Sequence, residues 1–553
     1  MHLKSLLLGV AALSLSAAAL AQAPAPSFTP EAFRAHVAFL AHDLLEGREA
    51  GTRGYDLAAQ YVATRFAGLG LQPAGANNGY FQEVPFVRYT PGGSPTLMVA
   101  GRSFAGGEAF SARAVPDAQP FALPATPAVF VGYGLDLPNQ GHDNYRGLDV
   151  RGKVVVALSG LPAGLPSDVS AHLNTEKRRM AAERGAVGMI LIPGSDAAAR
   201  AAHGRAAAQS ARPGTTWVDP QGVPYSDAGS LRFVATAGPE LAAALFEGAP
   251  RTLAQVQQAG AGGALRGFPL RQSVGFQRPG AQLTRFTSPN VLAVLPGSDP
   301  ALADEYVVLT GHLDGVGIIP EAEGATPGAD RIRNGAMDNA TGIASMLEVA
   351  RQLVASGQRP RRPILFAAVT AEEKGLLGAS YLAQNPVVGG RIVGLVNLDM
   401  PVLTYNFSDV IAFGAEHSTL GPIVERAARG MGVSVTPDPL PQEGLFTRSD
   451  HYMFVRAGVP SVFLMTGFAG EGQERFTSFL RGPYHGPGDD LNLPFDWGAG
   501  ARFAELNYRI LREIADGDAP PMWYSDSFFG QSLGGQGPRA ARPQPAAAST
   551  PAR

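Results

Sequence analysis

The chain has 553 residues, of which 45% are hydrophobic and 16% charged, and its formal net charge at pH 7 is −3. This length predicts about three domains, and the near-neutral charge argues against a nucleic-acid partner or binding to an anionic membrane surface. The sequence contains no cysteine, which excludes disulfides, a thiolate nucleophile and cysteine ligands to a metal.

Residues 1–21 have the composition of a secretory signal peptide. Lys4 supplies a positive charge, Ser5 to Leu20 are apolar or small, and the alanines around Leu20 form a small-x-small cleavage site before Gln22. Cleavage after Ala23 fits the same pattern but leaves a proline first. The apolar stretch is shorter than the roughly 20 residues of a membrane span. We therefore expect export to the periplasm or the medium, with no membrane attachment after cleavage.

Residues 22–95 are expected to begin the main domain with two amphipathic helices. Thr29-Pro30-Glu31 combines a capping hydroxyl, a first-turn proline and an early acid. Apolar residues then repeat at helical spacing from Phe33 to Leu44, and a second apolar face follows from Leu57 to Leu69.

Between residues 96 and 272 the sequence changes to short β-like runs rich in glycine and alanine. Val129–Leu135 and Lys153–Leu158 predict strands, and Lys177–Ile192 predicts a helix followed by a strand. The histidines of this segment are scattered, with no cluster of acids beside them, so we expect surface or loop roles for them. They are His142, His172 and His203.

From Ser288 onward, apolar strands alternate with helices, and the main domain is expected to occupy residues 273–518. This pattern is typical of an α/β fold with a mostly parallel mixed sheet flanked by helices. The expected elements are the strands NVLAVL and YVVLTG, a helix over 340–355, the strand PILFAAV, a helix near 375–383, and the strands IVGLVNLDM and PSVFLM. Residues 519–553 are rich in Gly, Pro, Ala, Gln and Ser, which predicts disorder.

Polar side chains follow the ends of these predicted strands, where ligands bind in open α/β sheets. Taken singly, Asp338 is explained as a helix cap and His485 as a solvent-facing loop residue. Two histidines and at least three carboxylates at one sheet edge are much harder to explain as structural. The residues are His312, Asp314, Asp338, Glu372, Glu373, Asp399 and His485.

Gathered carboxylates repel one another and raise one another's pKa unless cations lie between them. Two divalent ions would resolve the repulsion. Imidazole and carboxylate ligands without thiolate suit Zn²⁺, and Mn²⁺ or Co²⁺ can occupy similar sites. A metal pair needs a bridging carboxylate and one histidine plus one acid per ion, which the sequence supplies. One of the adjacent glutamates, Glu372 or Glu373, is then free to act as a general base.

The motifs GHLDGVG, NGAMDNATG, TAEEKGLLGAS, NLDM and PYHGPGDD resemble, in order and spacing, those of the co-catalytic zinc aminopeptidases, metallopeptidase family 28. The resemblance implies a zinc aminopeptidase or phosphorylase/hydrolase-like fold, two Zn²⁺ ions per chain, and peptide substrates with a free N-terminus. It implies one zinc held by His312 and Asp399, the other by Glu373 and His485, Asp338 bridging them, and Glu372 as general base.

The same resemblance implies roles for four further residues. Asp314 would orient the imidazole of His312, and Tyr484 would donate to the developing oxyanion or pack as an aromatic. In RSDHYMF, His451 would lie behind the ligands or serve the core, and Arg448 would contact a substrate carbonyl or carboxylate.

The resemblance extends to both sides of the metal motifs. Residues 43–75 are similar to the N-terminal helices of the family. The stretches YGLDLPNQGHDNYRGLDVRGKVVVALSG and AAERGAVGMILIPG resemble a protease-associated domain, so residues 96–272 are expected to form a smaller, β-rich α/β insertion. The expected function is removal of N-terminal residues from peptides. A carboxypeptidase or glutaminyl cyclase of the same fold, or an inert receptor-like binding protein, remains an alternative.

Overall fold

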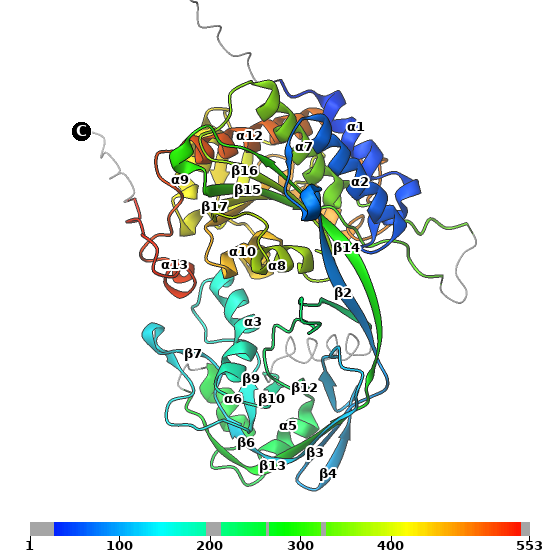
Figure 1. The fold of residues 1–553 in the computed structure, drawn as a ribbon. Helices are drawn as coiled ribbons and strands as arrows, with labels where there is room; N and C mark the ends of the chain where they lie inside the picture. Colours follow the sequence, from blue (N-terminus) through cyan, green and yellow to red (C-terminus); the bar gives the residue numbers. More distant parts are fainter. Residues whose placement is uncertain (1–26, 195–211, 262–264, 322–327, 544–553) are drawn as a thin grey trace, which may run out of the picture.

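The computed structural model describes residues 27–194, 212–261, 265–321 and 328–543, and shows a larger and a smaller unit (Figure 1). The predicted signal peptide at residues 1–21 and His203 lie outside these residues.

The larger unit is built on a ten-stranded mixed sheet. Its centre is four parallel strands in the order β16 (Ile364–Val369), β15 (Glu305–His312), β17 (Arg391–Leu398) and β20 (Ser461–Thr466). Every residue of β16 and β20 is buried, because helices cover both faces of the sheet. Burial on both faces explains why these strands have continuous apolar sequences. The predicted α/β class with a mostly parallel mixed centre is confirmed.

The sheet is extended on both sides by further strands. Antiparallel β18 (Asp409–Phe413) and then β19 (Ser434–Thr436) follow β20, while β14 (Ala281–Leu295), β2 (Phe81–Pro91) and β11 (Gly214–Trp217) follow β16. The two-residue β1 (Gln72–Pro73) pairs with β14.

Helices form a layer on each face of this sheet (Figure 1). One layer holds α1 (Pro30–Leu40), α2 (Arg53–Gly68), α7 (Thr341–Ala355), α9 (Leu420–Arg429) and α12 (Trp497–Asp516), and the other holds α8 (Leu377–Gln384) and α10 (His451–Arg456). Thr29 caps α1 as expected, but Leu44 lies beyond the end of α1 and is 77% exposed. Within the described ranges, no helix is both long and apolar enough to cross a bilayer.

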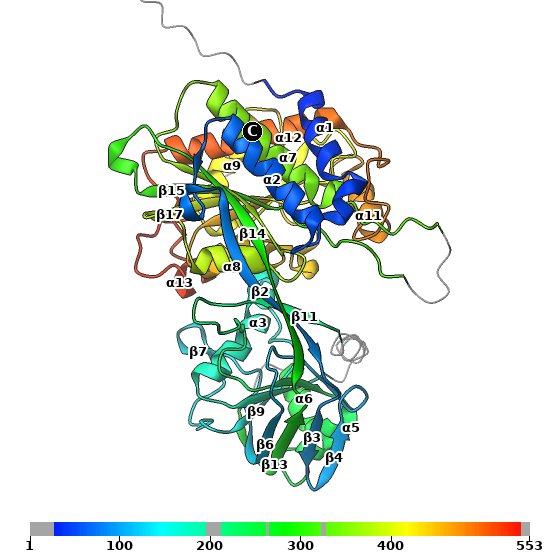
Figure 2. The ribbon, with the colours of Figure 1, turned by 45° about the vertical axis from the view of Figure 1, so that its right-hand side comes forward.

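The smaller unit contains an eight-stranded sheet. The long strands β2 and β14 connect it to the larger unit (Figure 2). Its parallel centre is β6 (Phe121–Phe130), β9 (Val154–Leu158), β10 (Gly188–Ile192) and β12 (Val234–Ala237). The other strands are β3 (Thr96–Val99), β4 (Arg102–Ala105), β5 (Phe110–Ala112) and β13 (Phe268–Arg278), and the helices are α3 (Ser167–Glu183), α5 (Pro239–Leu245) and α6 (Leu253–Ala261).

Two features of this unit differ from expectation. The segment β11 lies within residues 96–272 but pairs with β2 in the larger sheet. Helix α3 begins ten residues before the predicted Lys177, and His172 on α3 is only 3% exposed instead of lying on the surface.

The prediction that residues 519–553 are disordered is wrong for residues 519–543. The Trp523 side chain is buried and its Nε1 donates to the carbonyl of Gly458 at 2.8 Å, and the short helix α13 (Phe528–Ser532) follows. Phe529 is fully buried, with its ring 5.1 Å from that of Phe446. The few aromatic residues in a polar, glycine-rich segment supply the apolar burial that offsets the entropy of ordering it. Residues 544–553 lie outside the described part of the chain.

Replacing Phe529 with alanine tests the role of this C-terminal segment. Because Phe529 is fully buried, we expect Phe529→Ala to lower the free energy of unfolding by about 3–5 kcal/mol. Denaturant unfolding followed by tryptophan fluorescence measures the change. Leu44→Ala, at an exposed site, serves as the control and should stay within about 0.5 kcal/mol. Equal effects of the two substitutions would contradict the packing seen for Phe529.

Candidate metal centre

The polar residues predicted at the strand ends meet at the carboxyl edge of the central strands. His312 ends β15, Glu373 follows β16 and Asp399 follows β17. Asp338 lies in the turn before α7, and His485 lies in the loop that follows α11 (Gly472–Arg481).

Asp338 is shared between the two histidines. Its Oδ1 lies 3.1 Å from His312 Nε2, and its Oδ2 lies 3.2 Å from His485 Nε2. His312 Nε2 also lies 3.2 Å from Asp399 Oδ1, and His485 Nε2 lies 3.1 Å from Glu373 Oε2. The five side chains therefore form two groups of three, joined by the carboxylate of Asp338.

The geometry of both groups fits zinc. Ligand atoms about 2.0–2.1 Å from a tetrahedral zinc ion lie roughly 3.3 Å from one another, and the four N···O separations here are 3.1–3.2 Å. His312 Nδ1 lies 3.1 Å from the backbone carbonyl of Asp314, which can only accept a hydrogen bond. The proton of a neutral imidazole therefore sits on Nδ1, and the Nε2 lone pair faces the carboxylates. Three protein ligands per group leave a coordination position for water or substrate.

The electrostatics of the centre favour added positive charge. Burial opposes the charged form of His312, but the carboxylates of Asp399 and Glu372 outweigh burial and raise its pKa well above the usual value. Burial also opposes the charged form of His485, whose pKa is nevertheless raised to about 10 by hydrogen bonds to Asp338 and Glu373. For Asp338, burial raises the pKa, but the two imidazoles outweigh it and hold the pKa well below its usual range. Divalent cations supply the same positive charge.

Two buried carboxylates hold the turns that carry the ligands. The Asp489 carboxylate accepts hydrogen bonds from the backbone N–H groups of Met337 and Asp338 at 2.7 and 3.0 Å. The Asp314 carboxylate accepts the N–H groups of Glu372 and Glu373 at 3.0 and 3.3 Å. Burial is the main cause that raises the pKa of both carboxyls to about 7.

The contact between Asp314 and His312 differs in detail from the expected one. The carboxylate of Asp314 lies 3.9 Å from His312 Nδ1, too far for a hydrogen bond, and the backbone carbonyl makes the contact at 3.1 Å instead. The backbone carbonyl of Asp314 still orients the imidazole of His312. The carboxylate of Asp314 instead accepts hydrogen bonds from the N–H groups of Glu372 and Glu373.

Three residues that were not singled out in the sequence make hydrogen bonds around the centre: Asn339, Arg48 and Ser449. Asn339 Nδ2 donates to the carbonyls of Leu398 and His312 at 2.8 and 3.3 Å, which ties together the ends of β17 and β15. Arg48 is fully buried and donates to several carbonyls around the centre, and Ser449 Oγ donates to Asp399 Oδ2 at 2.6 Å. Each of them lies within a stretch that resembles the family, and this position was the one hint that the sequence offered. Their contacts could not be predicted, because they form only in the folded chain.

A cavity of about 220 Å³ opens beside the centre, next to Asp338, Glu372 and Asp399. Tyr484 lines it and stacks on the imidazole of His485, with ring centroids 3.8 Å apart. Most of the remaining wall is apolar. These residues are Met400, Leu445, Phe463, Met465, Phe476 and Leu480.

Arg448 and His451 both belong to the RSDHYMF segment but lie in different surroundings, one exposed and the other buried. The side chain of Arg448 is 53% exposed on the wall of the cavity, 3.9 Å from Glu443 Oε2. His451 is buried between the rings of Phe446 and Phe463, and burial lowers its pKa to about 3. Among the described residues, the His451 imidazole makes ring contacts with Phe446 and Phe463 and no hydrogen bond to a predicted ligand.

Asp450, between them, is a buried acid that the sequence did not single out. It is fully buried, and its carboxylate oxygens have no hydrogen-bond partner among the described residues. Burial raises its pKa well above the usual value, which favours the neutral form of the carboxyl group.

Part of the chain is similar to known proteins. The sequence model of Peptidase family M28 matches residues 290–511. The leupeptin-inactivating enzyme 1 of Streptomyces exfoliatus is 31% identical over 186 residues, which are 33% of this chain and 36% of that enzyme. A probable zinc metalloprotease of Pyrenophora teres f. teres is 37% identical over 112 residues, 20% of this chain and 22% of that protein. The chain thus matches about a third or less of the length of these relatives.

Among solved structures, the aminopeptidase from Aneurinibacillus sp. strain AM-1 aligns with 88% of this chain and 94% of its own length, at 19% identity and a TM-score of 0.46. All five candidate ligands and Glu372 fall inside the segment that matches the family model. The similarity of this chain to Peptidase family M28 thus covers residues 290–511, the segment that holds the candidate metal centre.

Proposed function

We propose that the chain is an exported aminopeptidase that uses two zinc ions to remove N-terminal residues with large apolar side chains from peptides. One observation carries the proposal. Glu372 and the two candidate ligands Asp338 and Asp399 line one largely apolar cavity, while the neighbouring Glu373 contacts His485. The proposed proton carrier, metal ligands and substrate pocket would then lie side by side, which supports the proposal. The signal-peptide pattern of residues 1–21 supports export.

The proposed metal ligands are His312 and Asp399 for one ion, Glu373 and His485 for the other, and Asp338 between them. Bound zinc supplies polarisation of the scissile carbonyl and a lowered pKa for the attacking water. The carboxylates around the centre would also hold the free amino terminus of the substrate.

Glu372 is the proposed proton carrier. It takes the proton of the attacking water and passes it to the leaving amine. Burial raises the pKa of Glu372 well above its usual value, and the charges of Glu373 and Asp399 add to this effect. A raised pKa suits a carboxyl group that must both accept and release a proton near neutral pH.

Tyr484 is the proposed donor to the oxyanion. Burial raises the pKa of its phenol, so the hydroxyl keeps its proton throughout the neutral range. The side chain lines the cavity beside Asp338 and Asp399, where a bound carbonyl would lie.

The lining of the cavity favours aminopeptidase over carboxypeptidase activity. A carboxypeptidase for acidic peptides needs cationic groups to hold the terminal carboxylate. Among the described residues of the wall, Arg448 is the one cation, and it faces Glu443.

Glu372→Gln tests the proposed function. We expect kcat on leucine nitroanilide to fall by about 10²–10⁴-fold, while metal analysis still finds two zinc ions per chain. Chelation should abolish the parent's activity, and N-acetylated substrates should not be cleaved. Glu443→Gln, at an exposed carboxylate on the cavity wall, is the matched control. A parent that binds no metal, or retains full activity after chelation, would disprove the proposal.

The pH dependence follows from the raised pKa of Glu372. Because the base must be deprotonated, kcat/KM should rise with pH through an inflection above the usual carboxyl range of about 4.3. Rates between pH 4 and 9 test this, with zinc content determined at each pH so that loss of metal is separated from protonation of the base. A flat profile with zinc retained would contradict the role of Glu372.

Phe476→Ala tests the apolar pocket. Phe476 is 3% exposed and lines the cavity, so its removal should lower kcat/KM for leucine relative to alanine substrates by about tenfold or more. Phe479→Ala is a matched control, because Phe479 lies on the same helix with the same burial but does not line the cavity. The same loss in both variants would point to general damage instead of pocket shape.

A further inference from the structure

One face of α3, in the smaller unit, carries three polar residues at helical spacing, Asp168, His172 and Glu176. Each contacts a residue of the larger unit. Asp168 Oδ2 lies 2.5 Å from His417 Nε2, His172 Nδ1 lies 2.8 Å from Tyr452 Oη, and Glu176 Oε1 lies 2.9 Å from a guanidinium nitrogen of Arg456. Since the residues are four apart on α3, they form one continuous stripe.

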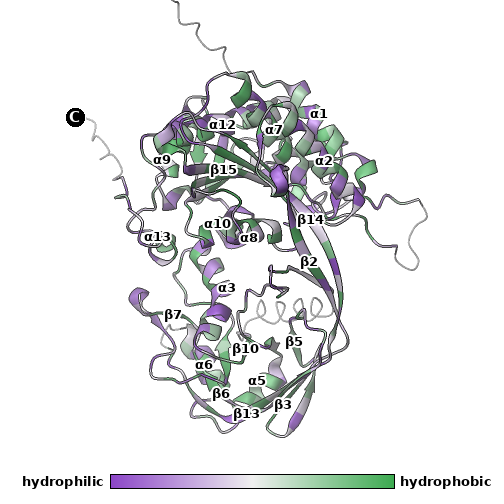
Figure 3. Cartoon of the chain, viewed as in Figure 1, coloured by the Kyte–Doolittle hydropathy of each residue, from purple (hydrophilic) through white to green (hydrophobic). Residues whose placement is uncertain are grey.

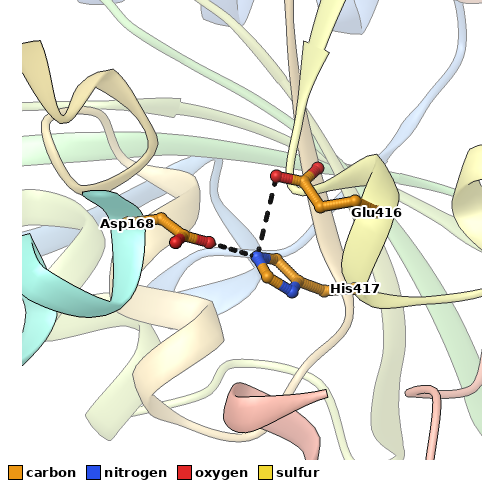
Figure 4. A group of neighbouring side chains, drawn as sticks. All are labelled: Asp168, Glu416 and His417. Atoms are coloured by element: carbon orange, nitrogen blue, oxygen red, sulfur yellow. Dashed lines mark hydrogen bonds and ion pairs between the residues drawn. The ribbon is translucent and has the colours of Figure 1, made fainter. Parts of the chain in front are cut away.

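The first of these contacts is an ion pair and not a metal site. Figure 4 shows Asp168 and Glu416 approaching the same nitrogen of His417. The separation of 2.5 Å between Asp168 and His417 is that of a direct hydrogen bond and is shorter than the 3.1–3.2 Å between ligand atoms in the metal centre. Glu416 lies 3.8 Å away, and its side chain is 60% exposed. This cluster therefore joins the two units.

The partners of the stripe lie next to the wall of the substrate cavity. Tyr452 and Arg456 belong to α10, and the residues just before α10, including Leu445, Arg448 and Ser449, line the cavity. Helix α3 also packs directly on this wall, since a Cβ added at Gly444 would lie 3.2 Å from the Cβ of Ala171.

The wall segment, residues 440–448, has little regular structure of its own. It contains only two single-turn helices, η7 (Pro441–Glu443) and η8 (Leu445–Thr447). Its buried anchor, Phe446, packs against His417, Tyr452 and Phe529. A segment with few backbone hydrogen bonds depends on its neighbours for a fixed position, and two of these neighbours are held by α3.

We propose that the smaller unit is a specificity element: through the stripe on α3 it fixes residues 440–448 as the wall of the pocket that binds the N-terminal side chain of the substrate. Asp168, His172 and Tyr452 act as positioning residues. None of them lines the cavity, and their effect reaches the substrate through Leu445. The inference rests on the proposed aminopeptidase function.

The double variant Asp168→Asn with Tyr452→Phe tests the proposal, because it removes the negative charge of Asp168 and the hydroxyl of Tyr452 with little change in volume. At about 1 kcal/mol for each of the two contacts, KM for leucine and phenylalanine nitroanilides should rise by up to about thirtyfold. We expect unchanged kcat, unchanged zinc content, and alanine nitroanilide kinetics within about twofold. Hydrogen exchange in residues 440–448 should accelerate by about tenfold. The single variant Asp168→Glu, with Tyr452 unchanged, keeps a carboxylate beside His417. It should show the parental KM values and the parental hydrogen exchange.

Asp136→Asn is the matched control, since it breaks an ion pair with Arg184 inside the smaller unit. It should leave both exchange and the leucine-to-alanine ratio unchanged. If the double variant does not fold, the single variant Asp168→Asn is tested in the same assays. Asp168 is partly exposed, so its replacement should have only a small effect on folding.

The outcomes separate the two proposals. Unchanged exchange in residues 440–448 would overturn the positioning role, and faster exchange with an unchanged leucine-to-alanine ratio would overturn the specificity role. A zinc-loaded parent that cleaves no aminoacyl substrate would instead overturn the proposed function. The exchange measurement needs no substrate and would then still decide whether α3 fixes the wall.

Discussion

Concentrated negative charge at the carboxyl edge of four buried strands is the constraint on which the rest of this structure depends. Asp338, Glu373 and Asp399 lie within reach of two imidazoles, and the partly buried Glu372 lies close to His312. Such a group is stable only where cations balance it, because burial multiplies the repulsion between like charges. The histidines supply part of the balance, and the proposed pair of divalent ions would complete it. The proposed arrangement of metal, base and pocket depends on this one balance of charge.

The chain holds this edge through its backbone. Asp489 and Asp314 each accept two N–H groups from the turns that carry ligands, and Asn339 joins the ends of neighbouring strands. These contacts fix where the ligand side chains begin, so that little freedom is lost when a metal binds. Preorganisation of this kind is what separates a working metal site from a collection of suitable residues.

The sequence predicted the central strands and pointed to His312, Glu373 and Asp399 because both leave a local signal, whereas the full set of five ligands was what the resemblance to the zinc aminopeptidases implied. Strands covered on both faces are continuously apolar, and the polar residue that ends each strand stands out against that background. Asn339 and the stripe on α3 leave no such signal, since their partners lie far away in the chain: His172 contacts Tyr452, 280 residues later. The first turns of α3 were missed because their apolar periodicity is weak. Val169 and Leu173 are buried there together with the polar His172, which contacts the other unit. Disorder was wrongly predicted for residues 519–543 because the overall composition is polar and rich in glycine. The composition does not reveal that a few aromatic residues, such as Trp523 and Phe529, are buried and order the segment.

The long strands β2 and β14 have a mechanical consequence. They pair without interruption from Phe81 and Val291 to Pro91 and Ala281, so the two units share one twisted ribbon in place of a flexible linker. The smaller unit is thus attached at two places, through the ribbon on one side and through the contacts of α3 with α10 on the other. A displacement of the smaller unit on this ribbon would change the contact between α3 and residues 440–448, which form part of the cavity wall.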